Sequence, residues 1–152
     1  MVEKNSMSGT YEASLADLFS ELVSVTLEYS GNAVTDIFIY ASLEDGVFFD
    51  PFFAIKREIF ERHKLPGIDT SIDRQRALVK YASRQLEQFA EGCSKFSQPV
   101  PSQIKLRYVV ATGRTDADLQ YEPQWSNTQD VSFHDRSEEW QEQVRLLLAS
   151  WE

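Results

Sequence analysis

The chain has 152 residues, of which 42% are hydrophobic and 12% aromatic, enough for one domain with a substantial core. This composition excludes an intrinsically disordered chain. The single cysteine, Cys93, excludes an intrachain disulfide and a cysteine-based metal cluster. We expect one domain over 1–152, with no signal peptide and no membrane contact, and therefore a cytoplasmic protein.

The formal net charge of −9 is unevenly distributed along the chain. Residues 67–114 have a net charge of +4, whereas residues 115–152 carry nine acidic and two basic side chains. An acidic C-terminal quarter argues against nucleic acid as a partner and favours a basic protein. The alternative interpretation is that these charges only keep the protein soluble.

A first amphipathic helix is predicted near the N-terminus. Residues 1–9 are polar, and we expect them to be disordered, with the helix beginning near Thr10 as its N-cap. Gly31 suits a left-handed C-terminal cap and ends the helix. The apolar side chains at helical spacing are Leu15, Leu18, Leu22, Val25 and Tyr29.

Residues 33–55 form the most hydrophobic stretch, AVTDIFIYASLEDGVFFDPFFAI. Asp45-Gly46 between two β-prone runs predicts a hairpin, because such turns need positive φ. Both faces of the hairpin are apolar, so we expect cover on both sides, from helices or from another chain. Pro51 indicates an edge or a bulge. Residues 56–64 suit a short helix or a third strand, and the pattern weakly favours the strand.

A central helix is predicted after Thr70 or Ser71, ending near Gly92. Basic residues give it a charged outer surface: Arg74, Arg76, Lys80 and Arg84. Its expected core face consists of Ile72, Val79, Ala82, Leu86, Phe89 and Cys93.

A second hairpin over residues 104–122 has clean alternation, with one apolar and one charged face. If Gly113-Arg114 are the two turn residues, Tyr108 lies opposite Leu119, and apolar residues meet across the pair. The same register pairs the other residues as follows: Val110 with Ala117, Leu106 with Tyr121, Lys105 with Glu122, and Val109 with Asp118.

A last helix is predicted to follow an irregular loop over residues 126–136. It begins near Asp135 or Ser137, and Asp135 and Glu138 have the spacing of a capping box. We expect this helix to cover the second face of the first hairpin. Its expected core face consists of Trp140, Val144, Leu147 and Trp151.

Together these elements predict an α+β fold. We expect an antiparallel sheet of four to five strands, built from two hairpins and packed with an N-terminal, a central and a C-terminal helix.

No constellation in the sequence points to catalysis, so we expect no enzyme activity, no cofactor and no metal. His63 lies between Arg62 and Lys64, a poor environment for a cation, and His134 lies in a polar loop. Glycine-rich phosphate loops and the common hydrolase motifs are missing. The acids Asp116, Asp118 and Glu122 could bind a hard cation, but a solvated ion-pair face is the preferred interpretation.

The order of elements resembles the YezG-like immunity family, whose members neutralise nuclease toxins. The resemblance covers roughly residues 15–125 and rests on order and spacing. The residues that carry it are Ile39-Tyr40-Ala41, Gly46-Val47-Phe48-Phe49-Asp50, Leu65-Pro66, the helix at 74–88, Ile104-Lys105-Leu106-Arg107-Tyr108, Gly113 and Asp118-Leu119-Gln120-Tyr121-Glu122.

The resemblance implies a protein that binds a cognate toxin, usually basic, and blocks its action. Asp116, Asp118 and Glu122 are the candidate contact residues, named for charge and expected exposure. One alternative is a structural or regulatory protein that forms a homodimer through the first hairpin. A less favoured alternative is a metal-dependent enzyme that uses the acidic strand face.

Overall fold

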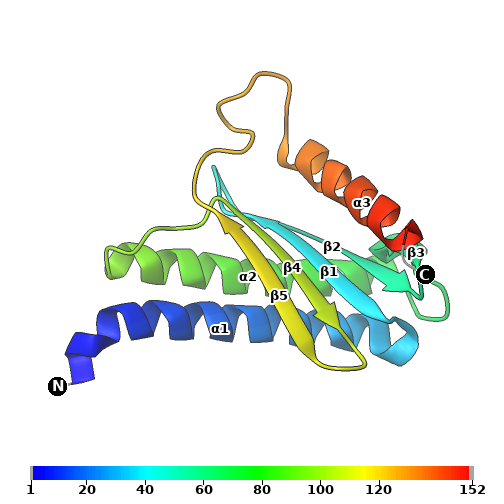
Figure 1. Cartoon of the computed structure of the whole chain (residues 1–152), viewed down its shortest axis with the longest axis horizontal. Helices are drawn as coiled ribbons and strands as arrows, with labels where there is room; N and C mark the ends of the chain where they lie inside the picture. Colours follow the sequence, from blue (N-terminus) through cyan, green and yellow to red (C-terminus); the bar gives the residue numbers. More distant parts are fainter. Residues whose placement is uncertain (1, 151–152) are drawn as a thin grey trace.

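The computed structural model describes residues 2–150, with the side chains of residues 2–10 and of Asn32 outside that description. These residues form an α+β domain with three α-helices and a five-stranded antiparallel sheet, as predicted (Figure 1). In chain order the elements are α1 (Val2–Ser30), η1 (Gly31–Ala33), β1 (Asp36–Ser42), β2 (Phe48–Ile55), β3 (Glu58–Glu61), η2 (Arg62–Lys64), α2 (Ile72–Lys95), β4 (Gln103–Val109), β5 (Arg114–Gln120) and α3 (Phe133–Ala149).

The sheet has the strand order β3-β2-β1-β4-β5, so the two hairpins meet along β1 and β4. All seven residues of β1 are buried. The strand predicted within 56–64 is confirmed as β3, which pairs with the C-terminal half of β2 only. Pro51 therefore lies where β2 has one strand neighbour, β1. This agrees with the prediction of an edge, because proline has no backbone N–H to donate to a strand on the other side.

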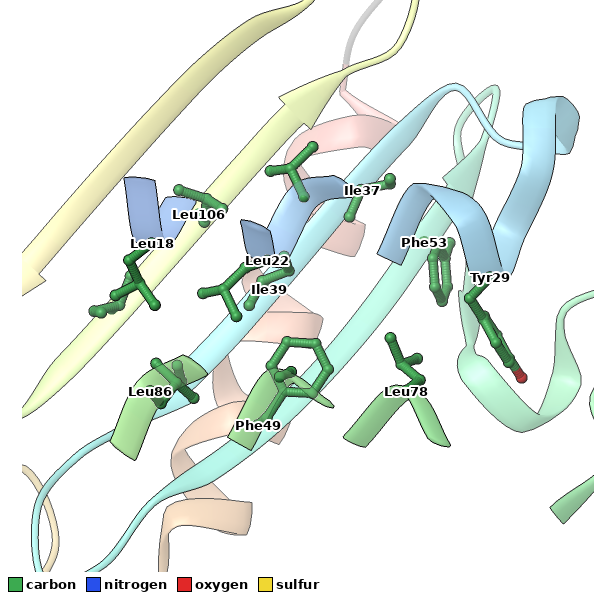
Figure 2. Packing of buried hydrophobic residues seen from close by; sticks show 14 of the residues in the cluster. Leu18, Leu22, Tyr29, Ile37, Ile39, Phe49, Phe53, Leu78, Leu86 and Leu106 are labelled. Carbon is green, nitrogen blue, oxygen red and sulfur yellow. The ribbon is translucent and has the colours of Figure 1, made fainter. Parts of the chain in front are cut away.

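The main core lies between the sheet and the pair α1 and α2, which run side by side in opposite directions (Figure 1). Figure 2 shows Leu22 of α1, Ile39 of β1 and Leu86 of α2 meeting in this layer, and all three are fully buried. Side chains at alternate positions of β1 face these helices, which follows from the period of a strand. This layer therefore covers one whole face of the sheet centre.

The second face of the first hairpin is covered by α3, as predicted. Phe38 and Phe52 stack with ring centroids 4.9 Å apart, and Trp140 of α3 contacts Phe52 edge-on at 5.2 Å. Val144 and Leu148 complete this smaller cluster. The alternative of a homodimer through the first hairpin depended on this apolar side, which is covered within the chain by α3. Self-association itself stays an untested alternative.

The register predicted for the second hairpin is wrong. Lys105 lies opposite Asp118 and Leu106 opposite Ala117, so every pair is shifted from the expected one. The loop spans residues 110–113, and the Gly113 amide, at φ +74°, donates to the Val109 carbonyl at 2.8 Å. The shift keeps both faces, because moving a register by an even number of residues leaves side chains on the same side.

Several predicted helix boundaries and core faces need correction. The first helix begins at Val2, so residues 2–9 are helical where disorder was expected, and Met1 lies outside the described residues. Gly9 does not end this helix, because a glycine costs only about 1 kcal/mol there. In α2, Ile72 is 60% exposed and Leu78 takes its expected place in the core. Ile72 is the first residue of the helix, whereas Leu78 is the first of its residues to be buried.

The last helix begins earlier than predicted, so the loop expected over 126–136 ends at Ser132. The capping box is formed by Ser132 and Asp135, whose side chains and amides bond reciprocally at 3.3 and 2.9 Å. Leu148, 1% exposed, lies in the core in place of Leu147, which is 51% exposed. Trp151 lies outside the described residues.

The long loop before α3 is attached to the first hairpin by Glu44. Its carboxylate accepts hydrogen bonds from the backbone amides of Gln124 at 2.7 Å, Trp125 at 3.2 Å and Ser126 at 2.6 Å. Burial acts to raise the pKa of Glu44, but a hydrogen bond from the Ser126 side chain and these three amide bonds outweigh it and hold the pKa below its ordinary value. The β1–β2 turn thus fixes where the chain leaves β5.

Candidate functional site

Two of the three acids singled out from the sequence lie together on β5, the last strand of the sheet. Asp116 lies opposite Arg107 of β4, and Asp118 lies opposite Lys105. Their side chains point away from α1 and α2, on the face that carries the charged residues of β4. The prediction that acids meet bases across this hairpin is confirmed, although with different pairs.

The charges continue inward as a row across three strands. Arg107 donates from Nη2 to Asp36 Oδ2 of β1 at 2.8 Å, and its guanidinium lies 5.6 Å from the centroid of the Phe38 ring. Asp36 is 6% exposed, so this inner pair is part of the domain interior. Asp116 is exposed and lies 3.2 Å from Arg114 Nε. Exposed pairs of this kind contribute little stability, about 0–1 kcal/mol.

Glu122 does not share this face. It follows the end of β5, is exposed, and its backbone carbonyl accepts a hydrogen bond from Ser102 Oγ at 2.6 Å. The structure therefore brings Asp116 and Asp118 together and places Glu122 in the following loop. The error came from the register, which had set Glu122 opposite Lys105 within the strand pair.

A groove on the opposite side of β5 was not predicted from the sequence. It has a volume of about 550 Å³ and lies between β5 and α1. Its apolar lining includes Phe19 and Val23 of α1, Tyr108 of β4 and Ala117 of β5. The one sequence signal is small residues at helical spacing on α1, Ala16, Ser20 and Ser24, which leave room beside the strand.

Both histidines line one pocket of about 210 Å³ between β2, η2 and the start of α3. His63 Nε2 lies 3.6 Å from Glu61, and His134 Nε2 lies 3.0 Å from Glu138. Among the described residues no group of three or more histidine, cysteine or acidic side chains is placed to hold a metal ion. Sequence reasoning treated the two histidines separately, because their proximity depends on where α3 docks.

Asp50, in the wall of this pocket, joins α3 to the sheet. Ser137 Oγ donates to one carboxylate oxygen at 2.6 Å, and Arg62 Nη1 donates to the other at 3.2 Å. Ser137 is fully buried. These bonds use the carboxylate to hold the helix in place, so we assign this cluster a structural role.

The remaining reactive or charged candidates are also engaged in the fold. Cys93 is buried in the main core, and burial raises the pKa of its thiol. Arg74 donates to the carbonyls of Tyr29 and Asp69 and lies over the Tyr29 ring, 4.7 Å from its centroid. Cys93 is therefore not placed to act as a nucleophile, and Arg74 is not placed to bind a phosphate.

Within residues 2–150, no helix has the length and apolar character needed to cross a bilayer. No protein-family model and no curated protein matches this chain.

Proposed function

We propose that this protein is a non-catalytic immunity protein, which binds a basic toxin, a nuclease, through the acidic edge of its sheet. The observation that carries the proposal is the position of Asp116 and Asp118. Both are exposed, they share one face, and they lie on the last strand of the sheet. The resemblance to the YezG-like immunity family supports the same function, and the cytoplasm is its proposed place of action.

The physical basis of the proposal is charge complementarity. A nuclease presents basic side chains to the phosphates of its substrate, and a protein with a net charge of −9 attracts such a surface. Complementary charges raise the association rate and disfavour wrong partners. Because β5 lies at the edge, a partner can reach its acids without displacing any helix.

The reading frames next to this gene are first searched for a nuclease-like toxin domain, and the test uses the domain found there. We expect coexpression to protect cells from the toxin, and calorimetry to give a complex between the purified proteins. The double variant Asp116→Asn/Asp118→Asn should weaken the complex by about tenfold or more, equivalent to about 1.4 kcal/mol.

The matched control is Glu87→Gln/Glu91→Gln, which removes the same charge from exposed positions on α2. We expect this control to change the affinity by less than about twofold, apart from a small long-range effect that salt screens. Equal losses in the two double variants would remove the site assignment. No binding to the toxin domain and no protection of cells would remove the proposed function.

A further inference from the structure

Within residues 2–150, no strand pairs with the outer edge of β5. In that range β5 pairs only with β4, and residues 114–118 are exposed. In an antiparallel strand, the backbone groups of alternate residues point to opposite edges. Half of the amides and carbonyls of β5 therefore point away from the sheet, ready to bond with another strand.

The two sides of this edge differ in chemistry. Arg114, Asp116 and Asp118 lie on the charged face, while Thr115 and Ala117 lie at the groove beside α1. A strand laid along this edge would place every second side chain against the charges. The side chains between them would extend over the groove, in contact with its apolar walls.

We propose that the partner binds by adding one strand to β5, using an extended segment with alternating charged and small apolar side chains. In an antiparallel arrangement its charged positions, read in chain order, are basic, basic and acidic, opposite Asp118, Asp116 and Arg114. Main-chain hydrogen bonds supply affinity, and the cross-strand ion pairs supply the register and the choice of partner. This inference rests on the proposed function, whose partner it specifies.

The charges on β5 argue against a second copy of this chain as the occupant. Antiparallel self-pairing over all seven residues sets Asp116 opposite Asp118 of the second copy, twice. Moving the axis to Asp118 sets that residue against itself, and moving it to Asp116 does the same while pairing Arg114 with Asp118 twice. A third self-pairing register, with its axis at Thr115, pairs Arg114 with Asp116. It joins only residues 114–116 of the two strands. Every self-pairing register that uses five or more residues of β5 thus brings two aspartates together, whereas a basic strand gains ion pairs as it lengthens.

The edge is tested first with three capped peptides and the isotopically labelled full chain. The matching peptide is Thr-Lys-Val-Lys-Val-Glu-Thr. A scrambled peptide of the same composition, Thr-Lys-Lys-Val-Val-Glu-Thr, places lysines on both faces. A third repeats the matching sequence with methylated backbone nitrogens, which cannot donate to β5. Affinities are read from amide shifts, and hydrogen exchange is followed residue by residue along β5.

We expect the matching peptide to bind about tenfold more tightly than either control, a difference of about 1.4 kcal/mol. We also expect it to slow exchange at alternate residues of β5, those whose amides point outward. Equal affinities, failure to bind at millimolar concentration, or changes confined to other elements would overturn the inference. Those results would mean that the charges of β5 only keep strands away.

The same exchange measurement on the complex with the toxin domain separates the two proposals. Alternate protection along β5 supports strand addition. A complex without that protection overturns strand addition and leaves the immunity function standing. Peptide binding at β5 with no toxin binding removes the immunity function and leaves the edge site. A dimer in sedimentation that Ala117→Lys dissociates would mean that a second copy occupies the edge, against the inference.

Discussion

The placement of α3 is tested by replacing two neighbouring leucines of the same helix. Leu148 is 1% exposed and packs in the cluster with Phe38, Phe52 and Val144, whereas Leu147 is 51% exposed. Leu148→Ala and Leu147→Ala make the same chemical change one residue apart. The two variants therefore differ mainly in the burial of the side chain that is removed, and little in the change of helix propensity.

The cost of the buried change follows from the site. Leucine-to-alanine substitutions in cores cost about 2–5 kcal/mol, depending on how far the surroundings collapse. Leu148 lies in the last turn of α3 and its cluster is small, so the lower part of that range, about 2–3 kcal/mol, applies. For a chain of this size the melting temperature falls by about 4–12 °C. Leu147→Ala should stay within about 0.5 kcal/mol of the parent.

The assay is urea unfolding followed by circular dichroism, with hydrogen exchange of the α3 amides as a local readout. Exchange matters because α3 could open before the rest of the domain unfolds. If Leu147→Ala costs as much as Leu148→Ala, or more, the face assigned to α3 is wrong. Trp140 would then not lie against Phe52.

Three further predictions concern single residues. Glu44→Gln should destabilise the protein by about 1–2 kcal/mol at neutral pH, because the amides of the loop lose a charged acceptor. The folded pKa of Glu44 lies below its ordinary value of 4.5. The difference in unfolding free energy between parent and variant should therefore be constant above pH 4.5 and disappear as the pH falls further. Unfolding curves measured from pH 7 to 3 test this. Arg107→Met should cost about 2–3 kcal/mol by leaving the buried Asp36 carboxylate without its ion pair, and adding Asp36→Asn should recover part of the loss in a double-mutant cycle. An additive double variant would argue against that coupling. Cys93 should react with a thiol reagent about 100-fold more slowly in the native protein than in urea, and fast native labelling would contradict its burial.

The sequence predicted the layers of this fold better than its registers. Alternation between residues 104 and 110 placed the charged face of the second hairpin correctly, because a strand has a period of two. Alternation does not specify the register, since even shifts preserve both faces. The register predicted from a turn at Gly113-Arg114 is wrong because the loop spans residues 110–113. In α3, Leu147 and Leu148 lie at i+3 and i+4 from Val144, so the helical period favours both, and the docking of α3 on the sheet selects Leu148.

The candidate site was predicted only in part for the same reason. The exposure and common face of Asp116 and Asp118 followed from local alternation. Their position at the sheet edge depends on β4 pairing with β1, a contact between distant segments that no local pattern encodes. The groove beside α1 likewise exists only once β5 and the helix are assembled.

β1 pairs along its whole length with both β2 and β4, yet its two partners differ in when they can form. The β1–β2 hairpin is local and closes quickly, whereas β4 follows only after β3 and α2 and must close a much longer loop. During synthesis the N-terminal part emerges first. Until residue 109 has left the ribosome, β1, all of whose residues are buried in the folded protein, keeps an open edge. That interval is the stage of its biogenesis most exposed to aggregation, and the stage at which a chaperone would bind.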